Sequence, residues 1–136
     1  FASSFECIVA GTGNKVEDFG VGFYTKYGDG GVDISPIADL LKSEVFSLSS
    51  YLKISKNILT AKPTDGLWDD GRTDEQQMGA NYSDLELAMN LVETKKDEKS
   101  LTEKERQLKN LFEKLQNQNK HKMHPIPVCK IPKNYL

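Results

Sequence analysis

Apolar residues recur at the spacing of an α-helix behind Ser35 and Pro36. A serine followed by a proline suits the N-cap and the first helical position, because the proline nitrogen has no hydrogen to leave unpaired there. The apolar positions that follow are Ile37, Leu40, Leu41, Val45, Leu48 and Leu52. The pattern therefore predicts a helix over residues 36–52.

Two more helices are predicted by capping boxes, in which a Ser or Thr is followed by a Glu on the first turn. Ser83 and Glu86 form the first box and predict a short helix over residues 84–93. Thr102 and Glu105 form the second box and predict a helix that ends near residue 119. Its apolar face comprises Leu108, Leu111, Phe112 and Leu115. The tail after it contains three prolines, which exclude regular helix, so we expect it to lie extended over the surface.

Only residues 5–10, FECIVA, form a run that is typical of a buried β-strand. A parallel strand needs neighbours, because unpaired buried backbone groups are expensive. The missing strands must come from sequence outside this chain, from another chain, or from strands that the pattern does not reveal. The hydrophobic fraction of 38% and the mean hydropathy of −0.54 are low for a self-contained α/β domain. We therefore expect the chain to be part of a larger protein.

Glycine is concentrated directly after this strand: residues 11–36 hold seven of the ten glycines. Glycine is costly to order and suits places where the backbone takes positive φ or where a ligand approaches its amides closely. Ligands of parallel sheets bind at the carboxyl ends of the strands. The strand followed by GTGN and a second glycine-rich turn therefore suggests a nucleotide-binding loop.

Residues 62–82 show neither a helical nor a strand period, and two glycines there flank acidic residues. Loops of this length are usually functional lids or disordered segments. Trp68 would anchor such a lid, although an exposed aromatic that awaits a partner surface fits the pattern as well.

Charge and composition exclude several classes of function. The chain has 18 Lys and Arg against 20 Asp and Glu, a net charge of −2, which argues against nucleic-acid binding through phosphates. No apolar run is long enough for a membrane span, and the first residues lack the pattern of a signal peptide. Two cysteines without a CxxC pair fit a reducing compartment, so we expect a cytoplasmic protein. The patterns of zinc, redox and serine-hydrolase sites are absent from the sequence.

Several unusual words follow one another in a fixed order. They are GTGN at residues 11–14, FYTKYGDGG at 23–31, DISPIADLLKSEV at 33–45 and PTDGLWDDGRTDEQQMG at 63–79, then HK and PVCKIP. Together with Glu17, these words closely resemble the carboxyl-terminal half of the ammonia-dependent NAD synthetases. The resemblance covers residues 5–132.

The resemblance implies an α/β fold of the adenine-nucleotide α-hydrolase type, with a Rossmann-like parallel sheet and flanking helices. Residues 1–136 would be the C-terminal portion of one such domain. Along the chain, the expected parts are the strand and GTGN loop at 5–34, the helix at 36–52, the lid loop at 62–82, and the helices and tail at 84–136. Family members are dimers, so a homodimer is implied as well.

The implied reaction is the amidation of deamido-NAD to NAD at the expense of ATP. The nicotinate carboxylate attacks the α-phosphate of ATP, which gives an adenylated intermediate and pyrophosphate, and ammonia then displaces AMP. Mg²⁺ is the implied metal and ATP the co-substrate. Catalysis of this kind rests on positioning and on neutralising charge.

The resemblance also implies a role for individual residues. The ATP-binding residues would be Thr12, Lys42 and Thr64, and the deamido-NAD-binding residues would be Lys26, Asp33, His121 and Lys122. Glu17 would supply a carboxylate to magnesium, and Asp29 would be the catalytic residue near the place where ammonia is received. Taken without the family, these side chains read as turn residues, surface lysines or a charged helix end. Phe23 and Tyr24 either stack on the nicotinate ring or fill core.

One expected element is absent from this sequence. The amino-terminal half of the family carries an SGGxDS loop that cradles pyrophosphate and supplies a second magnesium carboxylate, and no such loop occurs here. Activity of these 136 residues alone is therefore not expected. Two alternatives stay open: a catalytically inactive nucleotide-binding or assembly module, and the synthetase region of a glutamine-dependent NAD synthetase.

Overall fold

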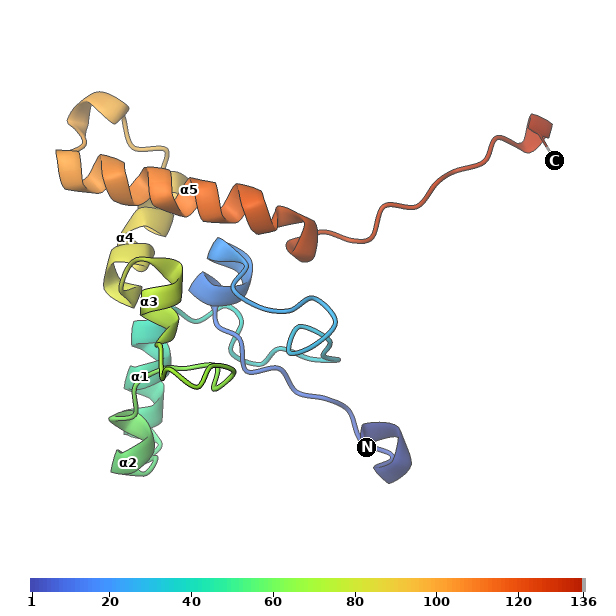
Figure 1. Ribbon diagram of the computed structural model, residues 1–136, viewed down its shortest axis with the longest axis horizontal. Helices are drawn as coiled ribbons and strands as arrows, with labels where there is room; N and C mark the ends of the chain where they lie inside the picture. Colours follow the sequence, from blue (N-terminus) through green and yellow to red (C-terminus); the bar gives the residue numbers. More distant parts are fainter. Residues whose placement is uncertain (136) are drawn as a thin grey trace.

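The computed structural model describes residues 1–135, and helices make up most of its regular structure (Figure 1). The α-helices are α1 (Lys42–Tyr51), α2 (Lys56–Leu59), α3 (Asp74–Met78), α4 (Tyr82–Glu93) and α5 (Glu103–Met123). A π-helix, η2 (Lys15–Val21), and three short 3₁₀-helices, η1 (Ala2–Phe5), η3 (Glu98–Ser100) and η4 (Lys133–Tyr135), complete the list. After α5 the tail is extended, as expected, but it runs away from the helices and does not lie over their surface (Figure 1).

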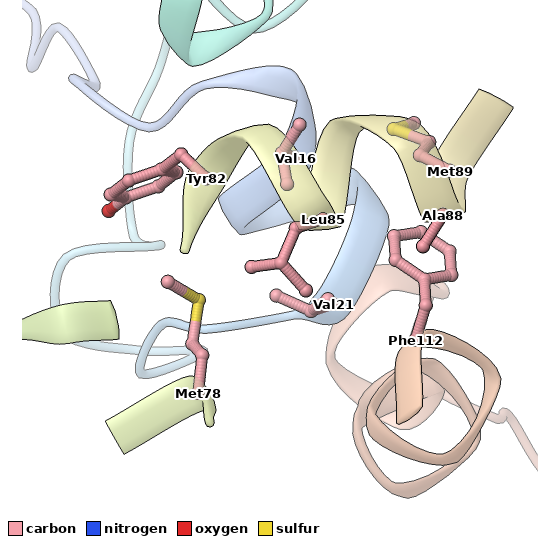
Figure 2. Packing of buried hydrophobic residues seen from close by; sticks show 8 residues of the cluster. All are labelled: Val16, Val21, Met78, Tyr82, Leu85, Ala88, Met89 and Phe112. Carbon is pink, nitrogen blue, oxygen red and sulfur yellow. The ribbon is translucent and has the colours of Figure 1, made fainter. Parts of the chain in front are cut away.

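The core lies where α4 packs against α5 and against η2. Leu85 of α4 is fully buried, and Phe112 of α5 is 1% exposed. Figure 2 shows the Phe112 ring reaching from α5 toward Ala88 of α4. The cluster consists of Val16, Val21, Met78, Tyr82, Leu85, Ala88, Met89 and Phe112. Because η2 shares this core, the packing of two helices fixes the segment that carries Glu17.

Helix α5 confirms the prediction from the second capping box. The backbone N–H of Thr102 donates to the Glu105 carboxylate at 2.8 Å, and the Thr102 hydroxyl accepts from the N–H of Glu105 at 3.2 Å. The helix continues to Met123, beyond the predicted end near residue 119. His121 and Lys122 therefore lie in its last turn.

Two other helices begin at residues that differ from the predicted ones. Helix α1 begins at Lys42, because the Glu44 carboxylate accepts a hydrogen bond from the N–H of Leu41 at 2.8 Å and residues 36–40 form turns. The predicted start after Ser35 is wrong. Helix α4 begins at Tyr82, two residues early, because the Asn81 side chain accepts from the N–H of Asp84 at 2.8 Å and replaces Ser83 as the cap.

The segment predicted as a lid loop contains a helix, so that prediction is wrong over residues 74–78. Thr73 and Gln76 form a capping box: the N–H of Thr73 donates to Gln76 at 2.8 Å, and the Thr73 hydroxyl accepts from the N–H of Gln76 at 3.3 Å. The helix that follows, α3, buries Met78 to 3% exposure in the core. The local signal for this helix is the box of Thr73 and Gln76, which stands next to glycines in a segment without a long apolar period.

The expected buried strand is not formed within residues 1–135. Residues 2–5 are the 3₁₀-helix η1, and only a single parallel bridge pairs Ala10 with Ile34. The N–H of Gly11 donates to the Ile34 carbonyl at 2.7 Å. Ile8 is 64% exposed, so the run is not buried in this chain. The bridge has no further partner strand among the described residues, and a ladder cannot propagate from it.

Gly22 ends η2 with a φ of +67°, and a Cβ there would stand 2.5 Å from Cβ of Asn119 on α5. Gly79 has a similar φ of +80°, but nothing lies within 4 Å of its Cβ position. We predict that Gly22→Ala lowers the free energy of unfolding by about 1–3 kcal/mol more than Gly79→Ala, because both carry backbone strain but only Gly22 meets a neighbour. Denaturant unfolding of both variants measures the difference, and equal losses would contradict the close packing of η2 on α5.

Candidate functional site

A cleft of about 310 Å³ lies between η2, the start of α1 and the segment that leads into α3. We call it the central cleft. It brings together five of the residues that the sequence singled out, which come from distant parts of the chain: Thr12, Glu17, Asp29, Lys42 and Thr64. Their convergence supports one shared binding site.

Glu17 is oriented by the last residue of the GTGN word. The side-chain oxygen of Asn14, which is 1% exposed, accepts hydrogen bonds from the N–H groups of Val16 and Glu17, both at 3.1 Å. This cap begins η2 and places Glu17 on its first turn. π-Helical turns are rare and often occur at functional sites. The sequence predicted a glycine-rich loop here and did not reveal a helix.

Glu17 and Lys42 form an ion pair at the wall of the central cleft. The Lys42 ammonium lies 3.0 Å from Glu17 Oε1, and the two side chains are only 19% and 13% exposed. The ammonium also stands 4.6 Å from the centre of the Tyr82 ring. The predicted magnesium-binding residue and one predicted ATP-binding residue thus hold each other in place. Their position is partly desolvated, and charge interactions there are stronger than in water.

Acidic side chains dominate the central cleft. Its lining includes Glu17, Asp18, Asp29, Asp65 and Asp74, and Lys42 is the only lysine or arginine that lines it among residues 1–135. Burial, together with the charges of Glu17 and Asp29, raises the pKa of Asp18 to about 6. The cleft therefore attracts cations, and a polyphosphate would enter it only with its charge neutralised.

The second glycine of GTGN packs directly against Asp18. A Cβ at Gly13 would stand 1.9 Å from an oxygen of the Asp18 carboxylate, so no larger residue fits unless Asp18 moves. Because Gly13 has no side chain, the Asp18 carboxylate can lie directly against the backbone of the GTGN loop. The sequence reasoning attached no role to Asp18.

A second, larger cleft of about 620 Å³ adjoins the first. We call it the outer cleft. Phe23, Tyr24, Asp29, Leu67 and Lys122 are among the residues that line it, and Asp29 is shared with the central cleft. Aromatic and aliphatic walls beside one ammonium and two carboxylates, those of Asp29 and Asp65, suit a flat, polar ring. Phe23 is partly buried and packs against the core, which confirms one of its two predicted roles, and stacking on the nicotinate ring stays a prediction.

Lys122 and Lys26 each make contacts within the chain. The Lys122 ammonium donates to the Tyr24 carbonyl at 2.7 Å and lies 5.3 Å from the ring centre, and burial lowers its pKa. The Lys26 ammonium donates to the carbonyls of His121 and His124, at 2.7 and 3.0 Å, at the end of α5. These contacts attach the YGDGG loop to α5. They bring together three residues that were predicted to bind the dinucleotide: Lys26, His121 and Lys122.

Asp33 stands apart from both clefts. Its carboxylate accepts a hydrogen bond from the N–H of Val9 at 2.8 Å, while its own N–H donates to the Val9 carbonyl at 2.9 Å. Within the described chain it fastens the bridge between residues 10 and 34. A role for Asp33 in dinucleotide binding stays a prediction.

The Thr64 side chain links the two ends of the loop at residues 64–72. Its hydroxyl donates to the Arg72 carbonyl at 3.1 Å and accepts from the N–H of Gly66 at 3.2 Å. Arg72 in turn lies over the Trp68 ring, with 4.4 Å between the guanidinium and the ring centre. The loop thus has internal contacts of its own, and Trp68 pairs with a cation from the same loop.

Two carboxylates of the central cleft are the residues that could hold a metal ion. Within residues 1–135, no group of three or more metal-ligating side chains converges tightly enough to hold an ion. Glu17 and Asp74 nevertheless line the same cleft, and Asp74 Oδ1 is buried without a hydrogen-bond partner among the described residues. Mg²⁺ needs only one or two protein carboxylates, because it takes its remaining ligands from substrate phosphates and water.

The family model of NAD synthase matches residues 1–126, which include every residue of both clefts. The chain belongs to the NAD synthase family. Among curated proteins, the NH(3)-dependent NAD(+) synthetase of Archaeoglobus fulgidus is 44% identical over 130 residues, which make up 96% of this chain and 49% of that protein. The corresponding enzyme of Methanosarcina mazei is 38% identical over 131 residues, 93% and 50% of the two chains. The chain thus spans about half the length of these NAD synthase relatives.

Solved structures agree with this membership. The NMN synthetase from Francisella tularensis superposes with a TM-score of 0.77 at 34% identity, over 96% of this chain and 50% of that one. The NH3-dependent NAD synthetase from Campylobacter jejuni superposes with a TM-score of 0.64 at 24% identity, which supports the fold alone. The sequence-based assignment to the family is confirmed. No helix within residues 1–135 is long and apolar enough to cross a membrane.

Proposed function

We propose that this chain is the carboxyl-terminal part of an ammonia-dependent NAD synthetase, a ligase that converts deamido-NAD to NAD with ATP and ammonia. The observation that carries the proposal is the paired Glu17 and Lys42 in an acidic cleft, on residues that belong to the NAD synthase family. AMP and pyrophosphate would be the other products, and an adenylated dinucleotide the intermediate.

The central cleft would receive the triphosphate of ATP. Lys42 supplies the cation for the phosphates, and Thr12 lines the same cleft, where its hydroxyl can donate a hydrogen bond to them. Glu17 and Asp74 would hold Mg²⁺, which when bound neutralises phosphate charge and polarises the α-phosphate for attack. The acidic lining makes such neutralisation necessary, because the phosphates would otherwise face five carboxylates.

The outer cleft would receive the nicotinate end of deamido-NAD. Lys122 lines this cleft and would face the anionic dinucleotide, Lys26 is attached to the end of α5, and Tyr24 offers a ring face for stacking. Asp29 lies between the clefts, where its Oδ1 accepts from the N–H of Thr25 at 2.8 Å. Its second oxygen is then the natural acceptor for the proton that nitrogen loses when ammonia forms the C–N bond and AMP departs.

The rest of the protein would complete the site. A Rossmann-like parallel sheet requires strands beside residues 9–10 and 34, and these would come from the half that the relatives possess in addition. That half would also carry the pyrophosphate loop, with the domain limits as predicted from the sequence. A cytoplasmic homodimer is the expected form, and both cysteines are free and exposed.

A direct assay tests the proposal. The complete protein, incubated with ATP, Mg²⁺, ammonium and deamido-NAD, should form NAD and AMP in equal amounts. Omission of ammonium should stop NAD formation without abolishing adenylation. Absence of any ammonium-dependent product would leave the inactive nucleotide-binding module as the remaining interpretation, and glutamine-dependent activity would indicate an additional amidase domain.

A second candidate substrate is nicotinate mononucleotide. The solved structure from Francisella tularensis carries the name NMN synthetase and shares 34% identity with this chain. Both substrates present the same nicotinate carboxylate, so the same cleft residues would serve either reaction. The ratio of kcat/KM for the two substrates in one assay decides between them.

Lys42→Ala should lower kcat/KM of the complete synthetase at least about tenfold, or ~1.4 kcal/mol. The substitution removes the only cation that lines the central cleft within the described residues and leaves Glu17 without its ion-pair partner. Lys114→Ala, on an exposed position of α5, is the matched control and should keep its activity. Wild-type kinetics of Lys42→Ala would show Lys42 to be a structural lysine only.

A further inference from the structure

Tyr82 connects two acidic residues of the central cleft. It is the first residue of α4, and its ring is 7% exposed in the core while its hydroxyl points away from the neighbouring Leu85 (Figure 2). The hydroxyl donates a hydrogen bond to Glu17 Oε1 and lies 3.5 Å from Asp74 Oδ2. A phenol has one hydrogen to donate, so in this arrangement it serves Glu17.

Oε1 of Glu17 is therefore held from two sides. Tyr82 donates to it from α4, and the Lys42 ammonium lies 3.0 Å from the same oxygen. The other carboxylate oxygen has no partner among the described hydrogen bonds and ion pairs. Fixing one oxygen in this way fixes the plane of the carboxylate, which leaves Oε2 for a ligand in the cleft.

Asp74 gives a second and independent indication of a ligand. The residue is 9% exposed, lines the central cleft from the start of α3, and has one oxygen that is buried and unpartnered within residues 1–135. A buried acceptor without a partner is costly, and such groups in native proteins usually face a ligand, an ion or ordered water. The Tyr82 hydroxyl lies between the two negatively charged carboxylates of Glu17 and Asp74, and Lys42 supplies one positive charge beside them. The net negative charge that remains favours a bound cation at this place.

We infer that Tyr82 is a positioning residue for the magnesium carboxylate Glu17, whose Oε1 it orients, and that Asp74 supplies the second carboxylate toward the hydrated ion. This inference rests on the proposed function. It adds two residues that the sequence reasoning did not single out. Partners of a metal-ligating carboxylate commonly change metal affinity by about 10–100-fold when they are removed.

The test measures metal affinity apart from turnover. Mg²⁺ binding to the complete synthetase with ATP is followed by titration calorimetry for Tyr82→Phe and Asp74→Asn. Tyr82→Phe keeps the ring over Lys42 and the core packing, and Asp74→Asn keeps the size of the side chain. Each should weaken Mg²⁺ binding at least about fivefold. Tyr51→Phe and Asp39→Asn, both exposed, are the matched controls and should bind as the unaltered protein does.

A double-mutant cycle separates positioning from a general structural effect. If Tyr82 acts through Glu17, Tyr82→Phe should cause little further loss in the Glu17→Gln background. An equal loss in both backgrounds would overturn the inference. So would unchanged Mg²⁺ affinity in Tyr82→Phe and Asp74→Asn while Glu17→Gln loses it, a result that leaves the proposed reaction and the role of Glu17 intact but removes Asp74 from the metal site. Unchanged affinity in all three variants would overturn the inference and the proposed metal site together.

Discussion

Glu17→Gln should lower kcat of the complete synthetase by about a hundredfold, or ~2.7 kcal/mol, at a fixed magnesium concentration. Glutamine keeps the shape of the side chain, and its carbonyl oxygen can still accept from Lys42 and Tyr82, which both bond to Oε1 in the structure. The substitution therefore removes the negative charge with little change in packing. Because Mg²⁺ prefers carboxylate oxygens, the loss should appear in the adenylation half of the reaction.

Activity measured against magnesium concentration checks this prediction. The half-saturating concentration should rise in Glu17→Gln, while the temperature of thermal unfolding stays close to that of the unaltered protein. Glu6→Gln, at an exposed position outside both clefts, is the matched control. An unchanged rate and an unchanged magnesium dependence would remove Glu17 from the metal site.

Elements whose signals are local could be predicted from the sequence. The box of Thr102 and Glu105 gave the start of α5 correctly, because both partners lie within one helical turn. The family words gathered Thr12, Glu17, Lys42 and Thr64 into one site, and the structure brings these four side chains to one cleft. Spacing along the chain alone would not have joined residues 17 and 42, whose contact depends on the folding of both segments.

Elements that depend on tertiary partners could not be predicted in the same way. The run at 5–10 has the composition of a strand, but its state depends on neighbours that this chain does not provide. Residues 74–78 lack a long apolar period because Met78 is the one apolar side chain that α3 buries. The sequence pattern placed Tyr82 in the predicted loop before the helix at 84–93. Its link to Glu17 spans 65 positions, and nothing in the local pattern indicates it.

The two lysines of the predicted dinucleotide site make contacts within the chain that the sequence pattern does not indicate. Lys26 and Lys122 were assigned to ligand binding, and the structure shows both ammonium groups bonded to backbone carbonyls. A side chain can do both, since an ammonium has three hydrogens to donate. The contacts attach the YGDGG loop to the end of α5, so the packing of that helix sets the geometry of the outer cleft.

Leu85→Ala should lower the free energy of unfolding of the complete protein by about 2–5 kcal/mol, because it leaves a cavity where α4, α5 and η2 meet. Leu85 is fully buried, whereas Leu87, two positions along the same helix, is 39% exposed. Leu87→Ala is therefore the matched control for helix propensity and should cost far less. Denaturant unfolding measures both variants. Because η2 carries Glu17 and rests on this core, Leu85→Ala should also weaken Mg²⁺ binding, whereas Leu87→Ala should not. Equal losses of stability in the two variants would contradict the core described here.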